Sequence, residues 1–98
     1  MFIVLLSYRK PLADVNEFLQ EHRKFLDRHY ASGVFLVSGR KEPRTGGFIL
    51  ATAPSRQDLM EILATDPFSR HGIADYEVIE VVASRTAPLL DFLLEAGS

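Results

Sequence analysis

The spacing of hydrophobic and polar residues changes several times along the chain, and each change predicts the border of an element. Residues 2–8 form an apolar run, rich in β-branched and aromatic side chains and ended by polar residues, which predicts a strand. From Asp14 the apolar residues recur three and four positions apart, which predicts a helix of about four to five turns that ends at Gly33. The apolar face of this helix consists of Val15, Phe18, Leu19, His22, Phe25, Leu26 and His29.

The remaining pattern predicts three more strands and a second helix. The predicted strands are residues 34–38, 47–52 and 75–83. A polar, basic loop separates the first two of them. Ser55 is a favourable N-cap for a short helix with an apolar stripe, and residues 66–72 have the composition of a turn. Residues 88–95 are apolar and predict a short C-terminal helix.

The predicted order is βαββαβ, which is that of an α+β, ferredoxin-like fold with an antiparallel four-stranded sheet and two helices on one face. The first three strands are apolar at both odd and even positions, yet two helices cover only one face of a sheet. We therefore expect a second copy of the chain to cover the other face, giving a homodimer built as a dimeric α+β barrel. Residues 1–85 form this domain, and residues 86–98 form a helical tail.

Composition narrows the possible partners. The 98 residues include 11 Lys and Arg against 13 Asp and Glu, a net charge of −2, which argues against a general nucleic-acid-binding protein. Without cysteine the chain has neither a thiolate nucleophile nor a cysteine-ligated metal site. The apolar residues 1–8 lack a basic n-region, run straight into Arg9 and Lys10, and are far too short to span a membrane. These features predict a cytoplasmic protein with no nucleic-acid or membrane partner.

His22 lies on the apolar face of the predicted helix, so its imidazole should point toward the sheet. It is either a core histidine held by a backbone carbonyl or a group that transfers protons. His29 lies two turns further on, about 10 Å away, which is too far for both residues to chelate one metal ion. Zinc sites on one helix use histidines four residues apart, so a site that adds His71 is disfavoured, and we expect no metal and no cofactor.

Asp66 opens the predicted turn, and two roles are open for it. As the residue before Pro67 it can cap the turn, with Phe68 as an ordinary core residue. Alternatively, it accepts a hydrogen bond from the His22 ring, selects the tautomer and raises the basicity of the ring, as in acid–base catalysis. The spacing of the two residues along the sequence does not decide between these roles.

Charge is distributed unevenly along the chain. Residues 1–56 carry nine Lys and Arg and five Asp and Glu, whereas residues 57–98 carry two and eight. The loop with Arg40, Lys41 and Arg44 contributes to this difference and is either a solvated hairpin or part of an anion-binding site. A locally positive entrance is consistent with a small anionic organic ligand.

Several short motifs together resemble the YCII-related family of YciI-like proteins over about the first 83 residues. They are His22-Arg23-Lys24-Phe25-Leu26, Gly33, the strand that ends at Gly39, Asp66-Pro67-Phe68 and Gly72. The resemblance implies a ferredoxin-like fold that dimerises as an α+β barrel, and a site in which His22 pairs with Asp66. Two positions depart from the pattern of many relatives: Gly39-Arg40 stands in place of Gly-Pro, and Gln20-Glu21 in place of Arg-Pro.

The resemblance also implies lyase-like proton chemistry, such as dehydrochlorination, on small oxygenated ring compounds. Our first hypothesis is therefore a cofactor-independent acid–base enzyme, lyase-like or isomerase-like, in which His22 transfers the proton and Asp66 orients it. Arg40, Ser38 and Phe68 are the expected substrate-binding residues. The alternatives are a non-catalytic small-metabolite-binding or accessory dimer and a small quinol-type monooxygenase.

Overall fold

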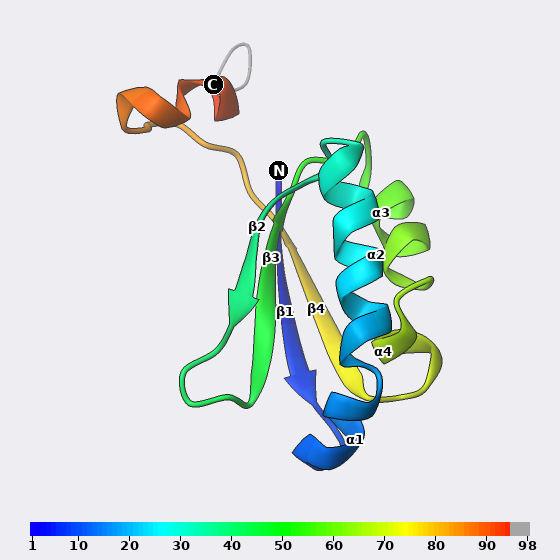
Figure 1. The fold of residues 1–98 in the computed structure, drawn as a ribbon. Coiled ribbons are helices and arrows are strands. Elements are labelled where there is room, and N and C mark those ends of the chain that lie inside the picture. The colour runs from blue at the N-terminus through cyan, green and yellow to red at the C-terminus, as the bar shows by residue number, and fades with distance from the viewer. Residues whose placement is uncertain (95–98) are drawn as a thin grey trace.

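The computed structural model describes residues 1–94 and contains one antiparallel four-stranded sheet with the order β2-β3-β1-β4 (Figure 1). The strands are β1 (Phe2–Tyr8), β2 (Phe35–Arg40), β3 (Gly46–Ala51) and β4 (Ala74–Glu80). In this part of the chain the α-helices lie together on one face of the sheet, and the other face carries none of them (Figure 1). The predicted α+β, ferredoxin-like fold is confirmed.

Four helices cover the sheet: α1 (Leu12–Glu17), α2 (Leu19–Ala31), α3 (Arg56–Leu63) and α4 (Pro67–Arg70). The prediction of a single helix from Asp14 to Gly33 is wrong, because the backbone leaves the helical conformation at Phe18, with φ −103° and ψ 4°. The Phe18 ring stacks on His71, with 4.3 Å between ring centroids. The apolar spacing runs through this break because both helices keep a side facing the core, with Val15 and Phe25 buried.

The core lies between the sheet and the helices. Along β1, Phe2, Val4 and Leu6 are buried, whereas Ile3 and Leu5 alternate with them and face the other side. On that other side the strand register places apolar residues next to one another. A row across all four strands consists of Val37, Leu50, Ile3 and Ile79. In the single chain this row is partly exposed, as the pattern of doubly apolar strands predicts.

The fourth strand ends at Glu80, three residues before the predicted end, and the chain then leaves the sheet. An extended segment leads to a 3-10 helix, η1 (Pro88–Leu93), which lies away from the sheet and the four helices (Figure 1). Its apolar side chains are exposed, Leu89 to 90% and Phe92 to 68%. The predicted C-terminal helix is thus present as a 3-10 helix, and Glu95 lies outside the described residues.

Candidate active site

The structure brings His22 and Asp66 together, although 44 residues separate them in the sequence. The Nδ1 atom of His22 on α2 lies 2.8 Å from Oδ1 of Asp66, the residue at the N-terminus of α4. The side chain of Asp66 is fully buried, and that of His22 is 12% exposed. The pair is therefore shielded from bulk water except at one edge of the imidazole.

Asp66 both caps α4 and contacts the His22 ring. Its Oδ1 atom also accepts a hydrogen bond from the Phe68 backbone N–H at 3.0 Å, which caps α4, and Pro67 occupies a position in the first turn of that helix. A carboxylate has enough lone pairs to accept from the backbone and the imidazole at once. The cap fixes the carboxylate in place, and the fixed carboxylate in turn orients His22.

Tyr76 on β4 supplies a third donor to Asp66, and the sequence reasoning missed it. Its hydroxyl donates to Oδ2 of Asp66 at 2.5 Å. Burial, followed by the negative charge of Asp66 and this hydrogen bond, raises the pKa of Tyr76 far above its usual range. The available signal was the alternation along β4, where Asp75 and Glu77 are exposed and place Tyr76 on the helix-covered face.

The hydrogen bonds define the tautomer of His22. An ionised carboxylate only accepts hydrogen bonds, so the proton on the Asp66 side of the imidazole is carried by Nδ1. The other ring nitrogen, Nε2, then holds a free lone pair. Phe68 stacks on the imidazole with 4.1 Å between ring centroids and 5° between ring planes, which keeps the ring from turning. The ring of His22 thus has a fixed orientation, and its Nε2 atom has no hydrogen-bond partner among residues 1–94.

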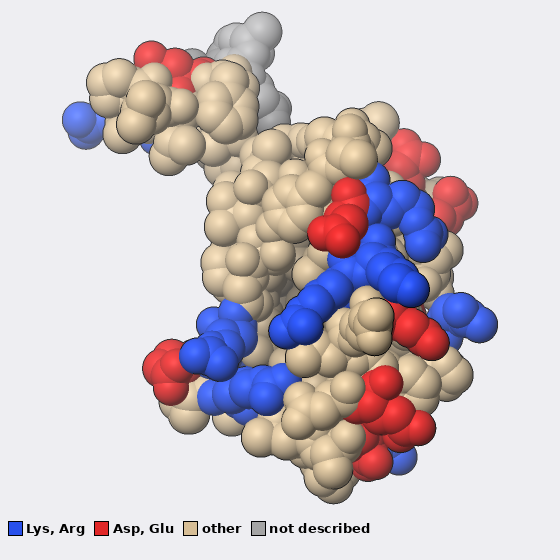
Figure 2. Space-filling model, viewed as in Figure 1, with Lys and Arg blue, Asp and Glu red and all other residues tan. Residues whose placement is uncertain are grey.

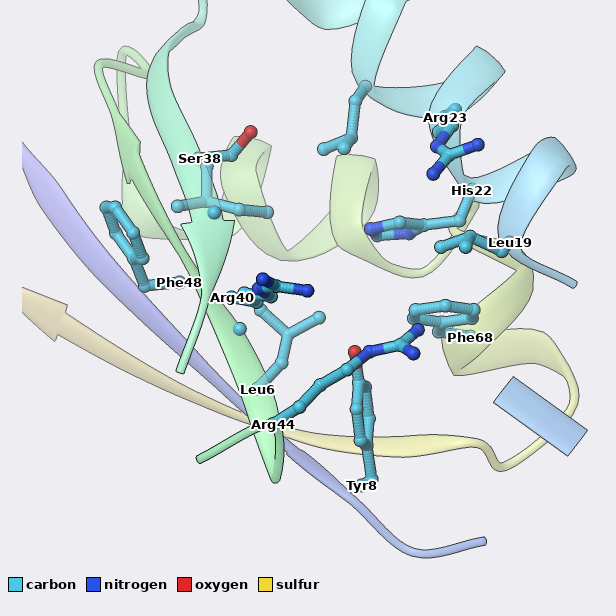
Figure 3. A pocket seen from close by; sticks show the side chains of 14 residues that line it. Leu6, Tyr8, Leu19, His22, Arg23, Ser38, Arg40, Arg44, Phe48 and Phe68 are labelled. Carbon is cyan, nitrogen blue, oxygen red and sulfur yellow. The ribbon is translucent and has the colours of Figure 1, made fainter. Parts of the chain in front are cut away.

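A cavity of about 420 Å³ adjoins His22. It lies between α2 and the sheet, with His22 and Phe68 on one wall and Ser38 and Arg40 from β2 on the opposite wall (Figure 3). All three expected substrate-binding residues therefore line the same cavity as His22. Its apolar lining includes Leu6, Leu19, Leu26 and Ile49. The hydroxyl of Ser38 forms a hydrogen bond with the Tyr30 hydroxyl, with 2.5 Å between the two oxygen atoms.

The charged side chains around the cavity are positive. Arg23, Arg40 and Arg44 line it together with His22, and no carboxylate belongs to its described lining. Figure 2 shows Lys and Arg side chains on both sides of the hollow between the sheet and the helices. The sequence reasoning considered Arg40 and Arg44 but missed Arg23, whose position next to His22 on α2 becomes informative only once the helix is placed.

The other two histidines lie in different surroundings. His29 packs against Phe25 and Phe35, and its Nε2 atom is buried without a hydrogen-bond partner. Burial and, to a smaller extent, Arg28 lower the pKa of His29. His71 stacks on Phe18. Within residues 1–94, no three His, Cys, Asp or Glu side chains are grouped so that they would hold a metal ion. No helix in this part of the chain is long and apolar enough to cross a membrane.

The protein thus has a ferredoxin-like fold in which a histidine–aspartate pair lies beside a cavity. The chain belongs to the YCII-related domain family, whose profile matches residues 1–82. This confirms the family that the motifs around His22 and Asp66 indicated. A search of curated proteins finds no match.

One solved structure with a similar fold is that of 5-chloro-2-hydroxyhydroquinone dehydrochlorinase (TftG) from Burkholderia phenoliruptrix AC1100, in complex with 2,5-dihydroxybenzoquinone. The two chains superpose with a TM-score of 0.70 at 19% sequence identity, over 83% of this chain and 93% of the other. The similarity therefore extends over nearly the whole of the neighbour. At this identity it concerns the fold.

Proposed function

We propose that the chain is a cofactor-independent acid–base enzyme that acts on a small oxygenated cyclic or aromatic compound. The observation that carries this proposal is the hydrogen bond between His22 and Asp66, which leaves Nε2 of the imidazole free at the cavity. In the proposed reaction Nε2 takes a proton from the substrate, and Asp66 orients the ring and stabilises the imidazolium that forms.

The proton transfer fits a lyase-like or an isomerase-like reaction. In an elimination, Nε2 accepts a proton from the substrate, the electron pair of the broken bond forms a new double bond, and the leaving group departs with its own bonding pair. In an isomerisation, the imidazolium returns the proton to another atom of the same substrate. General acid–base catalysis of this kind contributes roughly 10²–10⁴-fold to the rate.

The cavity supports a single-ring substrate. Its volume of about 420 Å³ lies in the lower part of the range usual for small-molecule sites. The apolar lining suits the faces of a ring, while Arg40 and Ser38 suit its oxygen substituents. A dehydrochlorinase with the same fold, solved with a dihydroxybenzoquinone, supports this class of compound. We propose that the ligand is anionic, because the charged side chains on the described lining are positive.

We also propose that the protein is a homodimer in which the uncovered sheet faces of two protomers meet. Val37 and Ile79 on that face are 47% and 37% exposed in the single chain. Together with Ile3 and Leu50 they form a continuous apolar row, and burial of such rows is the usual way to stabilise two packed sheets.

The test of the catalytic proposal begins with a turnover screen of chlorinated and unchlorinated hydroxyhydroquinones, including 5-chloro-2-hydroxyhydroquinone. For a substrate that the protein converts, His22→Asn should lower kcat by at least about a hundredfold, because the proton acceptor is lost. Asp66→Asn should lower kcat as well, because an amide no longer selects the tautomer. His71→Asn is the matched control, since His71 stacks on Phe18 and does not line the cavity.

The two alternative outcomes are distinct. A folded His22→Asn protein with unchanged turnover contradicts the acid–base role of His22. A metabolite that binds in the cavity and is never converted indicates instead a binding or accessory protein. Circular dichroism of each variant confirms that the fold persists, so that a loss of activity is not mistaken for unfolding.

A further inference from the structure

We propose that the ligand of this cavity is a carboxylic acid, and that Arg23 and Arg40 bind its carboxylate. This inference deepens the proposed function, on which it rests, by naming the class of substrate: a small ring compound that bears a carboxylate group besides its other oxygen substituents. Arg40 was expected at the site from the sequence, whereas the pairing with Arg23 follows from the fold.

Three separate elements bring guanidinium groups to one cavity. Arg23 lies on α2 directly after His22, Arg40 ends β2, and Arg44 lies in the loop between β2 and β3. Figure 3 shows Arg40 pointing from β2 across the cavity toward α2. Like charges that converge on a small space repel one another, and a bound anion removes this repulsion.

Arg23 and Arg40 have their hydrogen-bonding capacity free. In the described part of the chain, neither guanidinium group forms a hydrogen bond or an ion pair with another residue, whereas that of Arg44 donates to the Asn16 side chain at 2.9 Å. Arg9 and Arg56, which lie away from the cavity, have carboxylate partners on β4. Arg44 is therefore already anchored, and the two free guanidinium groups are the ones available to a ligand.

The chemistry of the lining favours a carboxylate over a phosphate. Phosphate sites commonly use backbone N–H groups at a helix N-terminus. Two helices begin at this site, and both carry negative charge there: Asp66 caps α4, and the first turn of α2, whose Leu19 lines the cavity, contains Glu21. Guanidinium groups bind a planar carboxylate through two parallel hydrogen bonds, and they do so without backbone donors.

The carboxylate also places the rest of the ligand. A group held by Arg23 and Arg40 lies at the side of the cavity where His22 and β2 face each other (Figure 3). The ring then extends over the apolar lining formed by Leu6, Leu19 and Ile49. Holding the carboxylate fixes the orientation of the ring relative to Nε2 of His22, which is how binding groups assist a reaction.

The experiment compares two ring compounds that differ only in charge. The probes are 2,5-dihydroxybenzoate and 2,5-dihydroxybenzamide, and their dissociation constants are measured by calorimetry and by NMR shifts of the His22 ring. The benzoate should bind at least about tenfold more tightly than the amide, because hydrogen bonds to a charged group contribute more than neutral ones. Arg23→Gln and Arg40→Gln should each reduce this preference several-fold.

The matched control is Lys41→Gln. Lys41 follows Arg40 directly, carries the same charge and bonds to Ser7 outside the cavity. This variant should keep the full preference for the benzoate. The inference is overturned if the amide binds as tightly as the benzoate, if neither probe binds at 10 mM, or if the arginine variants keep the preference. Displacement of the benzoate by equimolar inorganic phosphate would also overturn it, since the site would then bind anions generally.

The measurement separates this inference from the catalytic proposal. Binding is read without turnover, so His22→Asn should retain the preference for the benzoate even though it cannot transfer a proton. A preserved preference with no turnover of any compound would leave the carboxylate site standing and refute catalysis. Turnover that depends on His22, together with equal binding of both probes, would support catalysis and refute the carboxylate site.

Discussion

Asp66 accepts a hydrogen bond from each of three donors that come from α2, the α4 backbone and β4. It is the one fully buried charged side chain of the described core. A buried carboxylate is costly unless hydrogen bonds replace the water that it has lost, and here they do. The same three bonds hold the imidazole of His22 in the orientation that the proposed chemistry needs.

The raised pKa of Tyr76 predicts a loss of stability in alkaline solution. In the unfolded chain the phenol loses its proton near pH 10, whereas in the folded chain burial and Asp66 keep it protonated. Above about pH 10 the folded state therefore binds more protons than the unfolded state, so the free energy of unfolding falls as the pH rises. Urea denaturation between pH 8 and 11 measures this fall.

Tyr76→Phe removes the ionising group and should make the alkaline fall shallower. At pH 8 the same variant should lose roughly 1–3 kcal/mol of stability, because Asp66 then lacks one donor. Tyr30→Phe is the control, since Tyr30 is exposed and bonds to Ser38 away from Asp66; it should keep the wild-type slope. Equal slopes for wild type and Tyr76→Phe would show that the bond to Asp66 does not hold the phenol in its neutral form.

The sequence predicted only part of this site. Periodicity placed His22 on the buried side of its helix, and turn chemistry placed Asp66 at a cap. A contact between the two was one of two open alternatives, and only the family resemblance favoured it. Whether two residues 44 positions apart touch depends on how α2 and α4 pack, which no local pattern encodes. Tyr76 was missed for the same reason, because its contact depends on the position of β4 beneath α4.

The strands β1 and β3 approach so closely at one point that a side chain does not fit. Their register pairs Ser7 with Gly46 and Leu6 with Gly47. A Cβ atom on Gly46 would lie 1.8 Å from the Leu6 carbonyl oxygen, far inside contact distance. Gly46 thus permits β3 to start in register directly after the loop that carries Arg44.

Gly46→Ala should therefore destabilise the fold by roughly 3 kcal/mol or more, because backbone must move to admit the methyl group. The control is Gly33→Ala, where nothing lies within 4 Å of the added Cβ and the cost comes only from φ of +83°. That backbone strain costs about 1–2 kcal/mol. Urea denaturation of both variants gives the comparison, and a Gly46→Ala cost no greater than that of Gly33→Ala contradicts the close approach.

The hydrophobic pattern predicted the strands and helices well where buried and exposed residues alternate, but it did not predict where the chain bends. The order of strands and helices followed from period and turn residues such as Ser55, which caps α3 as expected. The break at Phe18 was missed because the apolar spacing continues through it. At the break the Phe18 ring stacks on His71 from another part of the chain, a tertiary contact that local spacing does not predict.

Within residues 1–94, both the open sheet face and the segment around η1 expose apolar side chains. The dimer that we propose predicts a mass of about 22 kDa, twice the 11.0 kDa of one chain, in sedimentation equilibrium at micromolar concentration. Leu50→Asp should shift the protein to a monomer, because Leu50 lies in the apolar row of the open face and a buried unpaired charge is unfavourable.

Met60→Asp is the control for this measurement. Met60 is an apolar residue on α3 that is 48% exposed, on the side of the sheet opposite to the proposed interface. It should leave the dimer intact. A wild-type protein that sediments only at the mass of one chain contradicts the dimer.

The domain boundary after residue 85 stays a prediction. The same sedimentation measurement tests it on a chain that lacks residues 86–98.

Asp66 both caps α4 and contacts His22, and this affects how sequence variation among relatives should be interpreted. A relative that lost its enzymatic activity during evolution would still need a cap for α4 and a partner for Tyr76, so selection for folding alone would retain the aspartate. The presence of Asp66 is therefore a poor marker of activity. Under the proposed catalytic role, His22 is a better marker, because no backbone group depends on its imidazole, and we expect a relative with a substitution there to bind its ligand without converting it.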